Sequence, residues 1–87
     1  HLLAEFLTAG VEVFDKAPFL ASELVSKAVR RPALDAVVER IVGSSKHPAH
    51  ALGAFLHRNQ GISVSGWHIE NVGDRRGSTL WALVPLE

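Results

Sequence analysis

The chain contains no cysteine, and its acidic and basic residues cancel in number. Without cysteine, neither a disulfide framework nor a thiolate zinc site can form. Nine Lys and Arg balance nine Asp and Glu, so the net charge gives no indication of a nucleic-acid partner, which usually requires a basic surface. No apolar run reaches the ~20 residues of a membrane span, so we expect a soluble, cytoplasmic protein.

The residues that are present suffice for one small domain. A length of 87 residues with 47% apolar side chains supports a single hydrophobic core, and residues 1–87 are therefore expected to form one domain. There is no internal repeat or low-complexity segment. Because the chain opens at His1, we expect a domain excised from a larger protein, with residues 86–87 as a candidate cloning remnant.

The charges are unevenly distributed along the chain. Residues 1–40 hold six of the nine acids, whereas residues 41–69 hold none and carry Lys46, Arg58 and four histidines. This second stretch contains no carboxylate that would repel a phosphate.

Apolar residues recur at helical spacing in the first two thirds of the chain. The four helices are expected at residues 2–14, 21–30, 32–42 and 47–60. Pro32 and Pro48 suit the first turn of a helix, and Gly43 suits the residue that follows one. A short extended segment is expected at residues 19–20, between the first two helices.

After Gly61 the apolar period changes from about 3.6 to 2, which predicts a β-hairpin. If its loop has five residues, Ile69 lies opposite Trp81 and Trp67 lies opposite Leu83, all on one face. The two tryptophans are therefore expected in the core rather than as platforms for base stacking.

Residues 73–77, Gly-Asp-Arg-Arg-Gly, form the predicted tip of this hairpin. Two glycines permit the turn, and Arg75 and Arg76 could reach phosphate oxygens or a minor groove. A solvated turn remains the alternative, because Asp74 next to the arginines would weaken a phosphate contact.

Four helices followed by a hairpin with a basic tip predict an α+β fold, the winged helix-turn-helix. Helix 47–60 is the candidate recognition helix, with its weakly basic outward face at His50, Gly53, Ala54 and His57. The alternative is that the small residues face a neighbouring element or solvent. The candidate nucleic-acid contacts are Lys46, His50, His57, Arg58, Arg75 and Arg76.

Arg30 and Arg31 form a further basic pair ahead of a proline. Such a pair can anchor a phosphate, but capping of the preceding helix through its dipole is the favoured interpretation.

No catalytic, cofactor or metal site is predicted. His47 and His50 have i,i+3 spacing, but His57 lies two turns beyond, about 10 Å away by helix rise, and no carboxylate or thiol lies near in sequence. The serines lack the nucleophile-elbow context, and no glycine-rich phosphate loop is present. We therefore expect the domain not to be an enzyme.

The last 40 residues or so contain the segment "KHPAHALGAFLHRNQGISVSGWHIENVGDRRGSTLWAL". It resembles the C-terminal segment of phage- and plasmid-encoded primase-helicase proteins of the superfamily three ATPase type. The matching positions are Leu52, Gly53, Leu56, Arg58, Gly61, Gly66, Ile69, Arg75, Arg76 and Trp81. The first 45 residues resemble that family only in their helix pattern.

The resemblance implies a winged-helix appendage that engages duplex DNA, such as an origin, next to a parent ATPase or primase domain. This chain departs from the family pattern in having uncharged or weakly basic residues at His57, Asn59, Gln60, Ser63 and His68, where Arg or Lys is expected. Weak DNA binding by the isolated domain follows from that departure. A protein-interaction or oligomerisation module with the same fold, including a homo-oligomer, is the alternative function.

Overall fold

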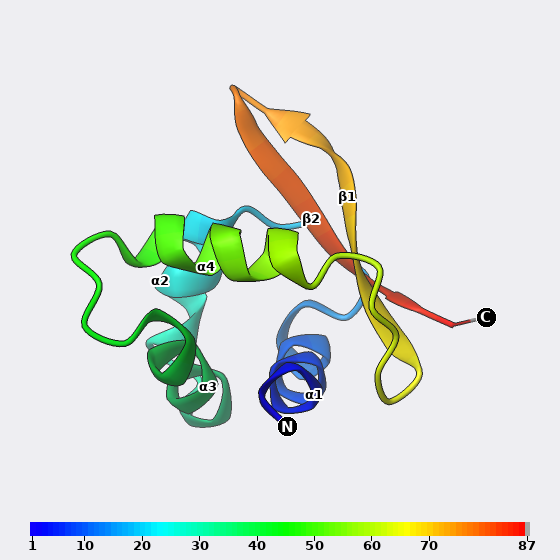
Figure 1. Ribbon diagram of the computed structural model, residues 1–87, viewed down its shortest axis with the longest axis horizontal. Coiled ribbons are helices and arrows are strands. Elements are labelled where there is room, and N and C mark those ends of the chain that lie inside the picture. Colours follow the sequence, from blue (N-terminus) through cyan, green and yellow to red (C-terminus); the bar gives the residue numbers. More distant parts are fainter. Residues whose placement is uncertain (87) are drawn as a thin grey trace.

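The computed structural model describes residues 1–86, and it consists of four α-helices followed by one antiparallel β-hairpin (Figure 1). The elements are α1 (Leu2–Phe14), α2 (Ala21–Ala28), α3 (Pro32–Val42), α4 (Pro48–Arg58), β1 (Trp67–Arg75) and β2 (Ser78–Pro85). The predicted α+β class, a winged helix with a C-terminal hairpin as its wing, is confirmed. Each helix begins and ends within two residues of its expected bounds.

Proline and glycine delimit the helices as the sequence predicts. Pro32 and Pro48 occupy the first turns of α3 and α4, where a missing N–H costs no intrahelical hydrogen bond. Gly43 follows α3 with φ 56°, a left-handed conformation that glycine adopts without the strain of a side chain.

The hydrophobic core lies between the helices and the lower half of the hairpin (Figure 1). The largest fully buried side chains are Phe6, Leu7, Phe19, Leu24, Leu34, Leu52, Leu56, Ile69 and Leu83. Phe6 packs edge-on against Phe55 with ring centroids 5.7 Å apart. Gly10 allows α1 to approach β2 closely, because a Cβ at this position would lie 2.9 Å from Leu83 Cδ1.

The predicted five-residue hairpin loop is wrong. β1 continues to Arg75 and β2 begins at Ser78, so the turn consists of Arg76 and Gly77, with φ 54° and 84°. Positive φ at both central residues is typical of the type I′ turn, whose twist matches that of paired strands.

The shorter turn changes the register of the hairpin. Ile69 pairs with Leu83, and Trp67 pairs with Pro85, instead of the expected partners Trp81 and Leu83. A β-bulge between Asn71 and Gly73 further shifts the pairing toward the tip. The predicted shared face survives, since an offset of two residues keeps the side-chain alternation.

The tryptophans belong to the core, as predicted. Trp81 is 3% exposed, and Trp67 is half-buried against the core cluster.

None of the helices formed by residues 1–86 is both long enough and apolar enough to cross a lipid bilayer.

The extended segment expected at residues 19–20 forms an isolated antiparallel bridge between Phe19 and Trp81 of β2. The N–H of Phe19 donates to Trp81 O and the N–H of Trp81 donates to Phe19 O, both at 2.8 Å. This bridge fixes the start of α2 beside β2 and so brings three segments distant in sequence, α2, α4 and the hairpin, around one space.

Candidate nucleic-acid interface

The outward face of α4 agrees with the helical projection of the sequence. Leu52, Phe55 and Leu56 are buried, whereas His50 and His57 are exposed.

The small residues of this face have different surroundings. Ala54 is exposed, but Gly53 is half-buried, and a Cβ on Gly53 would lie 4.0 Å from the Cβ of Ala21 on α2. The expectation that small residues face a neighbouring element therefore holds for Gly53 and not for Ala54. Gly53 allows α4 and the start of α2 to approach each other without a side chain between them.

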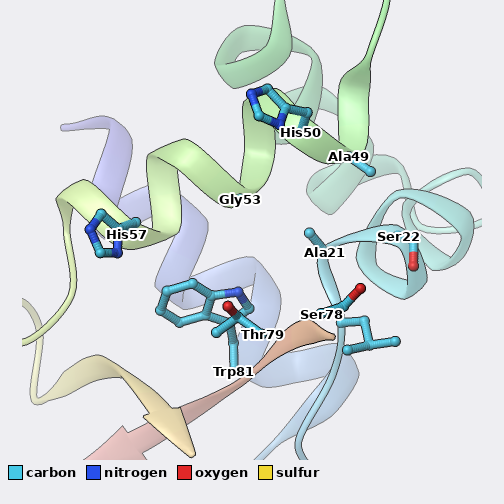
Figure 2. A pocket seen from close by; sticks show the side chains of 10 residues that line it. Ala21, Ser22, Ala49, His50, Gly53, His57, Ser78, Thr79 and Trp81 are labelled. Carbon is cyan, nitrogen blue, oxygen red and sulfur yellow. The ribbon is translucent and has the colours of Figure 1, made fainter. Parts of the chain in front are cut away.

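A cleft of about 410 Å³ opens between α4, the start of α2 and the beginning of β2. We call it the α4–wing cleft. Its lining residues are Leu20, Ala21, Ser22, Ala49, His50, Gly53, His57, Ser78, Thr79 and Trp81. Figure 2 shows His50 and His57 on successive parts of α4, on either side of Gly53, with Thr79 and Trp81 across the opening on β2.

The polar groups of the α4–wing cleft favour an anionic or neutral partner over a cationic one. Among residues 1–86, no Asp or Glu lines the cleft, and its polar groups are the imidazoles of His50 and His57, the indole N–H of Trp81 and the hydroxyls of three residues. Those three residues are Ser22, Ser78 and Thr79. Imidazole and hydroxyl groups can donate hydrogen bonds to phosphate oxygens, and an opening without carboxylates does not repel them.

Arg75 lies near the tip of the wing, but it already has an ionic partner. Its Nη1 lies 3.1 Å from Glu23 Oε2 at the start of α2, with both side chains half-exposed to solvent. This pair holds the tip of the hairpin against α2. An exposed pair of this kind contributes little to stability, so a phosphate can compete for the guanidinium.

Glu23 also receives a hydrogen bond from the backbone N–H of Leu20 at 2.9 Å. This bond is the main cause that lowers the pKa of Glu23; burial raises it in part, and the nearby charges of Arg75 and Lys27 lower it again. Glu23 is therefore a carboxylate at neutral pH. Its ion-pair partner, Arg75, lies next to the wing tip.

Arg76 occupies the turn itself and is fully available to a ligand. It is exposed, and within residues 1–86 no carboxylate lies within ion-pair distance of it. Its φ of 54° is unusual for a residue with a side chain.

The two remaining predicted contacts, Lys46 and Arg58, lie outside the cleft. Lys46 is exposed in the loop before α4, and Arg58 is exposed at the end of α4. Neither lines the α4–wing cleft. The structure thus brings His50 and His57 together in one cleft, puts Arg75 and Arg76 at the far end of the wing, and leaves Lys46 and Arg58 at opposite ends of α4.

Sequence reasoning missed the hydroxyl groups of the cleft. Ser22 reaches it only because the Phe19–Trp81 bridge places the start of α2 against β2. Ser78 and Thr79 reach it because β2 begins directly after a two-residue turn. The alternation of β2 could have indicated Thr79, whereas nothing in the local sequence around Ser22 indicates its neighbours.

Metal-binding side chains do not gather anywhere in residues 1–86, where no three His, Asp or Glu residues are placed to hold one ion.

This chain matches no protein-family model, and no curated protein or solved structure is significantly similar to it.

Proposed function

We propose that this domain is a DNA-binding winged-helix module that contacts duplex DNA through α4 and the tip of the wing. The observation that carries the proposal is the α4–wing cleft. The exposed imidazoles of α4 and the beginning of β2 line this opening, and no carboxylate of residues 1–86 lines it. Arg75 and Arg76 extend the same side of the fold toward the DNA backbone. Lys46 and Arg58 would add contacts at the two ends of α4.

The resemblance to phage and plasmid primase-helicase segments supports a role in replication, in the cytoplasm, beside a parent ATPase domain. Few cations face the cleft, so the binding should be weak and largely non-specific, with a dissociation constant of roughly 10⁻⁴ to 10⁻⁶ M. The domain itself needs no cofactor for this role, and we propose no catalytic activity for it.

The proposal is tested by fluorescence anisotropy with a labelled random duplex and the matching single strand, at about 50 mM and about 200 mM salt. Binding should weaken with salt. Replacement of both Arg75 and Arg76 by Gln should reduce the affinity and flatten its salt dependence, since about 0.9 of slope is lost for each duplex phosphate contact removed.

Two variants that add the same charge test the cleft itself. His50→Glu places a carboxylate at the cleft, whereas Thr8→Glu places one at an exposed position of α1 that does not line it. We expect His50→Glu to weaken binding at least about tenfold more than Thr8→Glu, because repulsion falls with distance in salt. Equal effects of the two variants, or no wild-type binding at 50 mM salt, would contradict the proposal.

A protein-interaction module is the second candidate, and one feature favours it. A groove of about 440 Å³ between α1 and α3 is lined mostly by small or apolar residues. With a net charge of zero, two copies of the chain do not repel each other. The partner that would bind in this groove is therefore a second copy of the chain. It predicts a dimer in sedimentation velocity that persists at high salt and is lost in Ala36→Glu. A monomer at high concentration would contradict it.

A further inference from the structure

Three of the nine cations of the chain fall within five residues, at Lys27, Arg30 and Arg31, and the proposed function does not use them. All three are exposed and, with Ser26, line a depression of about 450 Å³, to which none of the acidic residues among residues 1–86 contributes. We call these four residues the basic face of α2. It lies where α2 ends and the chain turns into α3.

The favoured interpretation, capping of α2 through its dipole, does not prevent these arginines from binding an anion. The helix ends at Ala28, just before them, so their charges can favour its dipole. The side chains of Arg30 and Arg31 donate no hydrogen bond to its carbonyl groups within residues 1–86. Over the same residues, no carboxylate lies within ion-pair distance of either arginine or of Lys27. The ammonium group of Lys27 lies 5.8 Å from the centre of the Phe14 ring, which leaves its charge available to an anion.

The basic face is continuous with the α4–wing cleft. A second depression, of about 410 Å³, lies between them beneath Arg75. It shares Ser22 with the α4–wing cleft, and it shares Ser26 and Lys27 with the basic face. Neighbouring depressions along α2 therefore share lining residues from the cleft to the turn before α3, and the Arg75–Glu23 pair lies at the middle one.

The charges along this connection are strongly unbalanced. Four cations line it, and the acids that face it are few. Glu23 lies in the middle depression and is paired with Arg75. Glu12 lines a separate shallow depression on the far side of Arg31. A domain with no net charge thus carries a local positive surface, which matches the regular negative charge of a phosphodiester backbone.

We propose that a DNA backbone bound at the α4–wing cleft continues across α2, and that Lys27, Arg30 and Arg31 bind its phosphates. This inference rests on the proposed function, because the cleft defines where the path begins. Lys27 lies in the last turn of α2, Arg30 and Arg31 lie in the turn that follows, and all three line the same depression.

Two charge-matched double variants test the path in the anisotropy assay. Arg30→Gln with Arg31→Gln removes two charges from the basic face. Lys16→Gln with Arg40→Gln removes two charges elsewhere, since neither residue lines the connected depressions. We expect the first pair to weaken duplex binding about tenfold at 50 mM salt and to reduce the salt slope by about 1.8, and the second pair to change both much less.

The outcomes separate the path from the proposed function. Equal binding by the two double variants, with salt-sensitive wild-type binding that still depends on His50 and Arg76, would overturn the path and leave the cleft as the DNA site. Absence of wild-type binding would overturn both. Circular dichroism of each variant checks that it remains folded, so that a loss of binding reports the contact.

Discussion

The two halves of the hairpin follow different physical demands. At its base, Ile69 and Leu83 pair across the strands and are fully buried against the helices. Toward its tip, Val72 is 45% exposed, and Arg75 and Arg76 face solvent. The base is part of the core, and the tip is held to the helices by the Arg75–Glu23 pair. One hairpin is therefore buried in the core at one end and exposed to solvent at the other.

A β-bulge separates these two halves. Val72 has no partner on β2, because Asn71 pairs with Trp81 and Gly73 pairs with Leu80. The N–H of Gly73 donates to Asn71 Oδ1 at 3.0 Å, and Gly73 adopts φ 134°, which disfavours any residue with a side chain. Bulges bend and twist a strand, so this one allows the tip to leave the direction that core packing imposes on the base.

The largest expected effect belongs to the base. Leu83→Ala removes a fully buried side chain that contacts α1 at Gly10, and it should lower the free energy of unfolding by about 3 kcal/mol. Urea denaturation followed by circular dichroism measures the change. A loss below about 1 kcal/mol would mean that the base of the hairpin is not part of the core.

A smaller effect is expected where the tip contacts α2. Glu23→Gln removes a charge at the start of the helix and the ion pair with Arg75, and it should lower the free energy of unfolding by roughly 0.5 to 1 kcal/mol. Because the native pKa of Glu23 is lowered, its stabilising effect is complete above the ordinary value of 4.5 and is lost as the pH falls through the native value.

The pH dependence gives the control for this variant. The free energies of unfolding of wild type and Glu23→Gln, measured by urea denaturation, should differ at pH 7. They should become equal in acid below the native pKa of Glu23. If the domain binds DNA as proposed, the same variant should bind more tightly than wild type, because it frees Arg75 and removes one negative charge from the proposed path. Weaker binding by a folded Glu23→Gln would indicate that the pair positions the wing instead of competing with phosphate.

The smallest effect on stability is expected at the turn. Arg76→Asn places a residue that tolerates positive φ in the first position of a type I′ turn, and it should raise the free energy of unfolding by up to about 0.5 kcal/mol. The same change removes an exposed cation, so DNA affinity should fall while stability rises. Thermal denaturation and anisotropy measure the two effects, and a parallel fall in both would show that Arg76 has a structural role.

The helices and the buried face of the hairpin were predictable because their periodicity reflects burial. The turn was not, because residues 73–77 contain two glycines and only one of them, Gly77, lies in the turn itself. An Asn-Gly pair would have marked the turn, whereas Arg76 adopts the left-handed conformation without that indication.

The part of the candidate site that lies on α4 could be predicted in the same way. The projection of α4 identifies His50 and His57, since both lie opposite the buried residues of the same helix. The connection over α2 could not be predicted, because Ser22 and Arg75 meet only through tertiary packing. Arg30 and Arg31 were visible in the sequence. That their side chains donate no hydrogen bond to the carbonyl groups of α2, within residues 1–86, is a property of the folded chain.

The Phe19–Trp81 bridge has a consequence for how this domain folds. It joins a residue near the first helix to one in the last strand, so its two hydrogen bonds can form only after nearly the whole chain has been synthesised. Contacts between residues so distant in sequence slow folding, because the entropy of closing a long loop must be lost before the contacts form. We therefore expect the helices to gather early and the wing to dock last, which makes attachment of the wing the final step of folding.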